Sequence, residues 1–155
     1  MKQINHILER LNELIILNEE VENAYVRASK SLVNSHNKTY ATERGQEREK
    51  IVNLLKIELS KIEKSEANAL AIKRKFHLMR LNFRKYFKIE NDPGFYVKVY
   101  EIEILSINKY DELLSQINLP LSLCRLLLKQ RDSLQARLHI IERGEIEALA
   151  PVNLD

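Results

Sequence analysis

Residues 4–32 read INHILERLNELIILNEEVENAYVRASKSL. Their apolar side chains recur at intervals of three and four residues, at Ile4, Ile7, Leu8, Leu11, Leu14, Ile15, Val21, Tyr25 and Leu32. This spacing is typical of one face of a single long helix that packs against a core. The polar stretch 34–37 interrupts the face, so we predict a helix over residues 3–34.

Three further segments show helical spacing, and we predict helices over residues 37–64, 92–118 and 120–149. The first of these segments carries an apolar stripe at Tyr40, Ile51, Leu54, Leu55 and Ile62. Asp92 followed by Pro93 indicates the start of the next helix, because a capping residue and a proline are favoured at a first turn. Pro120 opens the last helix and Pro151 ends it.

The breaks near residues 35 and 119 are short, so each adjacent pair of helices is expected to form an antiparallel hairpin. Two such hairpins bury their apolar stripes against each other as a four-helix bundle. Residues 69–88 are predicted to form a short basic crossover helix between the hairpins. We therefore expect an all-α, ferritin-like four-helix bundle in a single domain over residues 1–155, with its helices in up-down-down-up or up-down-up-down order.

Composition agrees with this class. The chain has 155 residues with only three Gly and three Pro, too few turn formers for most β architectures. No apolar run approaches the length of about 18 residues that a membrane span requires, and the amino terminus lacks the pattern of a secretory signal. We expect a cytoplasmic protein, with the lone Cys124 as a core residue that forms no internal disulfide.

Acidic residues on the core faces are the most informative positions, because a buried carboxylate is costly unless it is paired or bound to a metal. In an antiparallel hairpin, residues equally far from the turn lie opposite each other. In the first hairpin this places Glu22 within one helical turn of Glu47. In the second hairpin it places Glu103 within reach of His139. The centre of the bundle is therefore expected to be polar.

These four residues are candidate metal ligands: Glu22, Glu47, Glu103 and His139. Carboxylates and histidines from facing helices are how helical bundles bind metal pairs, and Fe, Mn or Zn would suit such a set. The Glu-x-x-His motif of dinuclear sites does not occur in the chain. Both a degenerate or mononuclear metal site and a dinuclear oxidase site stay open as interpretations.

A structural network is the third interpretation of the same residues. In it, Glu22 and Glu47 pair with Lys50 or Arg48. Tyrosines of the core faces, Tyr25, Tyr100 and Tyr110, would donate hydrogen bonds to Glu103 and its neighbours. Such a network can hold helices in register without any ligand.

The stretch 11–28, LNELIILNEEVENAYVRA, resembles the first helix of a bacterial family of ferritin-like proteins catalogued as a domain of unknown function. The resemblance rests on the spacing of Leu11, Asn12, Leu14, Ile15, Asn18, Glu22, Tyr25 and Ala28. A helix around Glu47, a crossover helix, and later helices containing Glu103 and Gln130 extend it over most of the chain. The resemblance implies a ferritin-like bundle and a link to metal handling.

Residues 69–89, ALAIKRKFHLMRLNFRKYFKI, are basic and contain no acid. The candidate surface-binding residues are Lys73, Arg74, Lys75, Arg80, Arg84, Lys85 and Lys88. Aromatic residues recur between them at helical spacing, which predicts a basic amphipathic helix. This helix could pack on the bundle with its charges solvated or paired, bind an anionic membrane surface, or, as the least favoured alternative, bind nucleic acid.

Taken together, the residues favour a non-enzymatic ferritin-like helical protein with a degenerate, metal-binding polar centre. One alternative is a helical scaffold that uses residues 69–89 to bind a protein partner or an anionic surface. Another is a di-metal oxidase. Self-association as a homo-oligomer, a dimer in the simplest case, is expected for a bundle of this kind.

Overall fold

The computed structural model describes residues 2–63, 69–89 and 91–144, with side chains given for residues 6–62, 76–89 and 91–144. All regular structure in these residues is helical: α1 (Lys2–Ser31), α2 (Ser35–Glu63), α3 (Ala69–Tyr86), α4 (Phe95–Leu114) and α5 (Leu121–Glu142). The predicted all-α class is confirmed. No helix within the described residues has the length and apolar character needed to cross a membrane.

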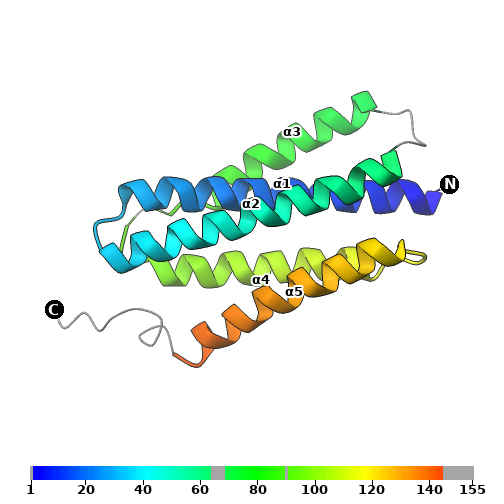
Figure 1. Ribbon diagram of the computed structural model, residues 1–155. Coiled ribbons are helices and arrows are strands. Elements are labelled where there is room, and N and C mark those ends of the chain that lie inside the picture. The colour runs from blue at the N-terminus through cyan, green and yellow to red at the C-terminus, as the bar shows by residue number, and fades with distance from the viewer. Residues whose placement is uncertain (1, 64–68, 90, 145–155) are drawn as a thin grey trace.

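The helices form two hairpins that pack against each other, α1 with α2 and α4 with α5 (Figure 1). Helices α2 and α4 run in the same direction, and α1 and α5 run in the opposite one. This order requires a long connection, and α3 supplies it by carrying the chain back along the outer side of α1. The predicted crossover helix is therefore present.

The buried apolar residues form two clusters along the hairpins. The first includes Leu11, Leu14, Leu55, Leu113, Leu123 and Leu127. The second includes Val21, Tyr25, Tyr40, Phe87, Phe95 and Val99. Phe87 follows the last residue of α3, so the crossover is anchored to the second cluster by its aromatic end. Cys124 is only half-buried, so the prediction that it is a core residue is wrong.

Helix α4 begins later than predicted, at Phe95 rather than at residue 92. The reason is that the Asp92 carboxylate does not cap α4. It accepts hydrogen bonds from the backbone N–H groups of Val33 and Asn34, at 2.9 and 3.2 Å, in the turn between α1 and α2. It also accepts one from the Asn37 side chain at 2.9 Å. Asp92 thus connects the two hairpins at one end of the molecule.

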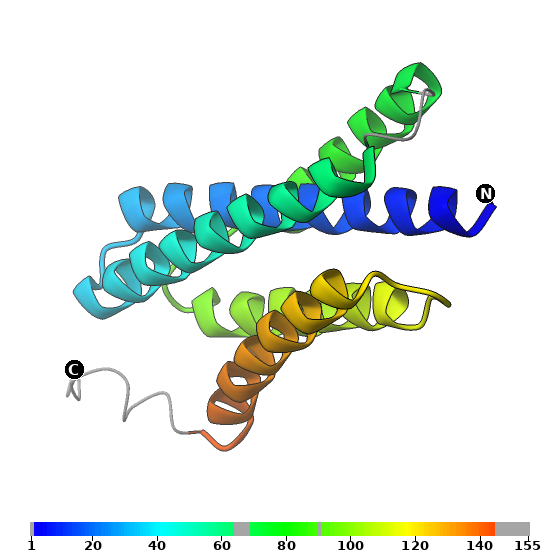
Figure 2. The same cartoon turned by 45° about the vertical axis from the view of Figure 1, so that its right-hand side comes forward.

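Helices α1 and α2 approach each other closely at Gly45. A Cβ atom on Gly45 would lie 3.5 Å from Cβ of Tyr25 and 3.6 Å from Cγ2 of Val26. These are ordinary van der Waals distances, so an alanine would also fit at this position and would fill the space beside Gly45. In the second hairpin the two helices are not parallel to each other: α5 diverges from α4 towards the C-terminal end of α5 (Figure 2).

Candidate functional site

The centre of the molecule holds a buried ion pair between the hairpins. Arg48 of α2 is 0% exposed, and its Nη2 donates to both carboxylate oxygens of Glu103 on α4 at 3.1 Å. Its Nη1 donates to Oδ1 of Asn18 on α1 at 2.7 Å. The Tyr25 hydroxyl, also on α1, donates to Oε1 of Glu103 at 3.2 Å. Both oxygens of Glu103 therefore accept hydrogen bonds from the surrounding protein.

A second chain of polar contacts extends the centre to α5. The Tyr110 hydroxyl of α4 donates to Oε1 of Gln130 at 2.7 Å, and Nε2 of Gln130 faces the carbonyl oxygen of Ile51 at 3.5 Å. Asn18 also donates from its Nδ2 to the carbonyl oxygen of Leu14 one turn earlier, at 2.9 Å. Polar side chains at this level thus join α1, α2, α4 and α5.

The charges of the pair support each other. Burial is the strongest single influence on the pKa of Arg48 and acts to lower it, but Glu103, with smaller contributions from Tyr25, Tyr110 and Glu47, raises this pKa above its ordinary value. Burial, and then the charge of Glu103, raises the pKa of Tyr25 well above its ordinary value, so Tyr25 stays a neutral hydrogen-bond donor. A guanidinium does not lose its proton in proteins. The centre therefore contains a permanent cation supplied by the chain itself.

The four predicted metal ligands are not gathered into one group. Glu103 is paired with Arg48, and Glu47 accepts from Nε of Arg137 at 3.0 Å. Glu22 is half-buried, and burial and then the neighbouring Glu49 raise its pKa. His139 is exposed and its Nε2 faces Nε2 of Gln135 at 3.1 Å. Across residues 2–63, 69–89 and 91–144, no three His, Cys, Asp or Glu side chains are grouped as a metal site would require.

The network interpretation is correct for the pair of Tyr25 and Glu103 but wrong for the partners of Arg48. Tyr25 does donate to Glu103, as predicted. Arg48 pairs with Glu103 from the other hairpin rather than with Glu22 or Glu47, and Glu103 does not face His139. Gln130 was missed as a network member, although its position one turn before Leu134 on the apolar face of α5 indicates an inward side chain.

The basic crossover helix is held to α1 by ion pairs. Arg80 donates to Glu19 at 2.9 Å, and Nε of Arg84 donates to the buried Glu20 at 2.9 Å. Two of the seven candidate surface-binding residues are therefore engaged within the chain. Lys73, Arg74 and Lys75 lie outside the residues whose side chains are described.

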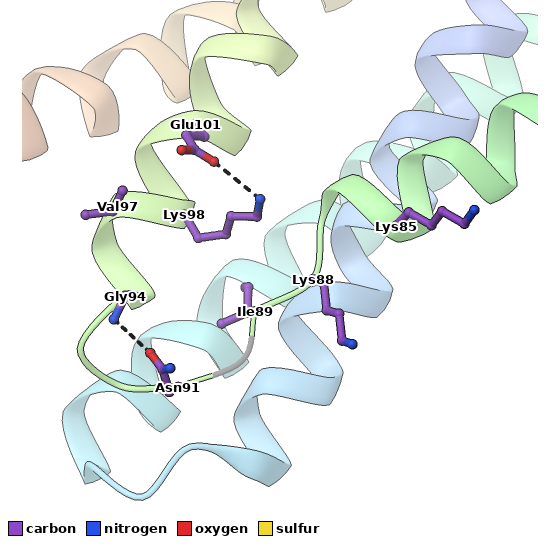
Figure 3. A pocket seen from close by; sticks show the side chains of 8 residues that line it. All are labelled: Lys85, Lys88, Ile89, Asn91, Gly94, Val97, Lys98 and Glu101. Carbon is purple, nitrogen blue, oxygen red and sulfur yellow. Dashed lines mark hydrogen bonds and ion pairs between the residues drawn. The ribbon is translucent and has the colours of Figure 1, made fainter.

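The remaining two, Lys85 and Lys88, line a groove between the end of α3 and the start of α4, which we call the α3–α4 groove (Figure 3). Its volume is about 530 Å³, and it is lined by Lys85, Lys88, Ile89, Asn91, Gly94, Val97, Lys98 and Glu101. Lys98 reaches from α4 towards α3, pairs with Glu101 at 3.3 Å and lies 4.6 Å from the centre of the Tyr86 ring. The groove combines three cations, one anion and apolar side chains.

Comparisons with known proteins add no relative: no protein-family model, no curated protein and no solved structure gives a significant match to this chain.

Proposed function

We propose that this protein is a non-enzymatic helical scaffold that binds an acidic segment of a protein partner in the α3–α4 groove. The observation that carries the proposal is the composition of the groove, whose lining holds Lys85, Lys88 and Lys98 together with Val97, a residue that is 64% exposed. An exposed apolar side chain beside several charges of one sign is typical of a surface that binds peptides of the opposite charge.

The central ion pair supports a non-enzymatic role. A metal at Glu103 would have to displace the Arg48 guanidinium, which donates to both of its carboxylate oxygens. Breaking a buried ion pair leaves an uncompensated charge and costs about 3–5 kcal/mol. The ferritin-like resemblance, self-association, and metal binding through Glu22, Glu47, Glu103 and His139 stay predictions.

The shape of the groove favours a protein segment over a membrane. The groove lies between two helical elements, and Lys98 points into it from α4 while Lys85 and Lys88 come from α3 and the residues that follow. A concave site with cations on both walls suits a carboxylate-bearing strand or helix, whereas a lipid surface contacts the outermost face of a helix. Leu78 and Leu81 are further exposed apolar residues of α3 outside the groove lining.

The proposal is tested with a fluorescent helical peptide of Glu and Leu as the probe, measured by anisotropy. We expect saturable binding that weakens with salt and falls by about tenfold or more in the double variant Lys85→Glu/Lys98→Glu. Lys50→Glu/Lys129→Glu is the matched control, because it makes the same change of charge at exposed lysines outside the groove.

Two results would contradict the proposal. One is an equal loss of peptide binding in both double variants, which would show a general effect of net charge. The other is sedimentation with phosphatidylcholine vesicles containing about 30% phosphatidylserine together with no binding of the peptide, which would favour the membrane interpretation.

A further inference from the structure

The residues that follow Gly144 have a charge opposite to that of the α3–α4 groove. They read EIEALAPVNLD over positions 145–155, which lie outside the described part of the chain. We call them segment 145–155. The segment contains three acids and neither Lys nor Arg. Its apolar residues with large side chains are Ile146, Leu149, Val152 and Leu154. Negative charge and apolar side chains thus occur together in one short stretch of sequence.

The lining of the α3–α4 groove presents the complementary groups. It holds three lysines and a single acid, Glu101, which already pairs with Lys98 at 3.3 Å. Lys85 is exposed and makes no ion pair with any residue that the structure describes. The apolar residues Ile89 and Val97 belong to the same lining. An excess of positive charge together with apolar side chains suits a segment that is both acidic and apolar.

Segment 145–155 leaves the described chain at the end of the molecule that carries the groove. Helix α5 ends at Glu142, at the same end of the molecule at which α4 begins (Figure 1). Ile141 packs against the second apolar cluster, and so does Ile89 of the groove lining. The eleven residues of the segment span at most about 36–40 Å. A helix with its side chains is about 10–12 Å across, so the segment is long enough to pass the start of α4 and reach the groove.

We propose that segment 145–155 binds in the α3–α4 groove of its own chain and competes there with an acidic partner. This inference rests on the proposed function, because the groove is the site proposed for the partner. A binding segment that is tethered to its site acts at an effective concentration on the order of millimolar. Even a weak interaction then fills the groove in a large share of the molecules. An acidic partner must displace the segment, which makes the segment a regulator of the site.

The direct test couples carboxylates to lysine amines in the whole chain with a water-soluble carbodiimide and identifies the linked peptides by mass spectrometry. We expect links from Glu147 or Asp155 to the lysines of the groove at low salt, and fewer at high salt. A mixture of nitrogen-15-labelled and unlabelled chains separates links within one chain from links between copies.

Three results of the coupling experiment would overturn the proposal. One is the absence of links between the segment and the groove. Another is a set of links that join different copies only. The third is an equal yield of links to the groove lysines and to Lys50 and Lys129, which are exposed outside the groove.

The competition test measures the affinity for the fluorescent peptide of Glu and Leu by anisotropy. Glu147→Lys/Asp155→Lys should strengthen peptide binding by about threefold or more, because the segment no longer occupies the groove. Glu49→Lys/Asp132→Lys is the matched control, since it makes the same change of charge at exposed acids outside both the segment and the groove. Equal gains in the two double variants would show an effect of net charge alone and would also overturn the proposal.

The two proposals fail in different ways. Equal peptide affinities of the wild type and Glu147→Lys/Asp155→Lys would refute competition by the segment and leave the proposed function intact. If the peptide binds neither protein, while the wild type still shows carbodiimide links between the segment and the groove, the proposed function fails. Occupancy of the groove by segment 145–155 is supported in that case.

Discussion

Arg48 and Arg44 lie one turn apart on α2 and are both buried, but they have opposite surroundings. Arg48, at the centre, donates to Asn18 and to both oxygens of Glu103. Arg44, nearer the end, leaves Nε and Nη1 without hydrogen bonds in the described part of the chain. The same residue type is thus fully hydrogen-bonded in one turn and incompletely hydrogen-bonded in the next.

The difference comes from the helices that face each turn. At Arg48, α1 and α4 both supply acceptors at hydrogen-bond distance. At Arg44, the nearest acids are Glu43 and Glu47 of the same helix, at 3.7 and 3.9 Å, beyond hydrogen-bond distance, and Oε2 of Glu47 already accepts from Arg137 of α5. Complete hydrogen bonding of a buried guanidinium favours stability, whereas incomplete hydrogen bonding does not. The predictions below test this contrast, from the largest expected effect to the smallest.

Replacing Arg48 by Met should lower the free energy of unfolding by about 3–5 kcal/mol, because the buried Glu103 carboxylate loses its counterion. Glu103→Gln should act in the same direction by leaving the guanidinium unpaired. Urea unfolding followed by circular dichroism measures both. A loss below about 1 kcal/mol for both variants would show that the central pair does not stabilise the fold.

Tyr110→Phe should cost about 1–3 kcal/mol, because it leaves the buried Gln130 oxygen without its 2.7 Å hydrogen bond. Tyr86→Phe is the control, since the same hydroxyl is removed from an exposed tyrosine. Its effect on urea unfolding should stay within about 0.5 kcal/mol. Equal effects of the two variants would show that the hydrogen bond of the Tyr110 hydroxyl does not stabilise the fold.

Asp92→Ala should lower the free energy of unfolding by about 1 kcal/mol at neutral pH. The reason is that three hydrogen bonds between Asp92 and the turn that joins α1 to α2 are lost. The backbone N–H of Val33 is the main cause that lowers the pKa of Asp92 in the folded state. The folded state therefore binds fewer protons than the unfolded chain at acidic pH. The contribution of Asp92 is present above about pH 4 and is lost as the pH falls through the lowered pKa.

Unfolding curves of the wild type and Asp92→Ala at several pH values check this, with Asp132→Ala as the control at an exposed aspartate. The difference in unfolding free energy between the wild type and Asp92→Ala should shrink below about pH 4. A difference that is constant from neutral to acidic pH would mean that the ionised carboxylate is not what holds the turn.

Arg44→Met should change the free energy of unfolding by less than about 0.5 kcal/mol, or raise it, because a buried cation whose Nε and Nη1 lack hydrogen bonds is removed. It is the matched partner of Arg48→Met, with the same substitution one turn away. The difference between the two variants in urea unfolding measures how much complete hydrogen bonding of a buried arginine contributes to the free energy of unfolding. A loss for Arg44→Met as large as that for Arg48→Met would erase the contrast between the two turns.

Much of the fold could be predicted from the sequence because the signals were local. The apolar stripe at residues 4–32 predicted a helix over residues 3–34, and α1 spans Lys2–Ser31. The basic residues 69–89 predicted a crossover helix, and α3 spans Ala69–Tyr86. The start of α4 could not be placed correctly, because the side chain of Asp92 contacts a turn about 60 residues earlier, and no local pattern reports such a contact.

The site was predictable only in part. Sequence periodicity alone determined that Glu103 and Tyr25 face inward, and that the centre is polar, because a 3.6-residue period assigns each side chain to a face of its own helix. Which inward residues meet was decided by the tertiary structure. The rotation of one hairpin against the other places Arg48 on Glu103 and leaves Arg44 beside a cavity, and that rotation follows from the packing of all the buried side chains together.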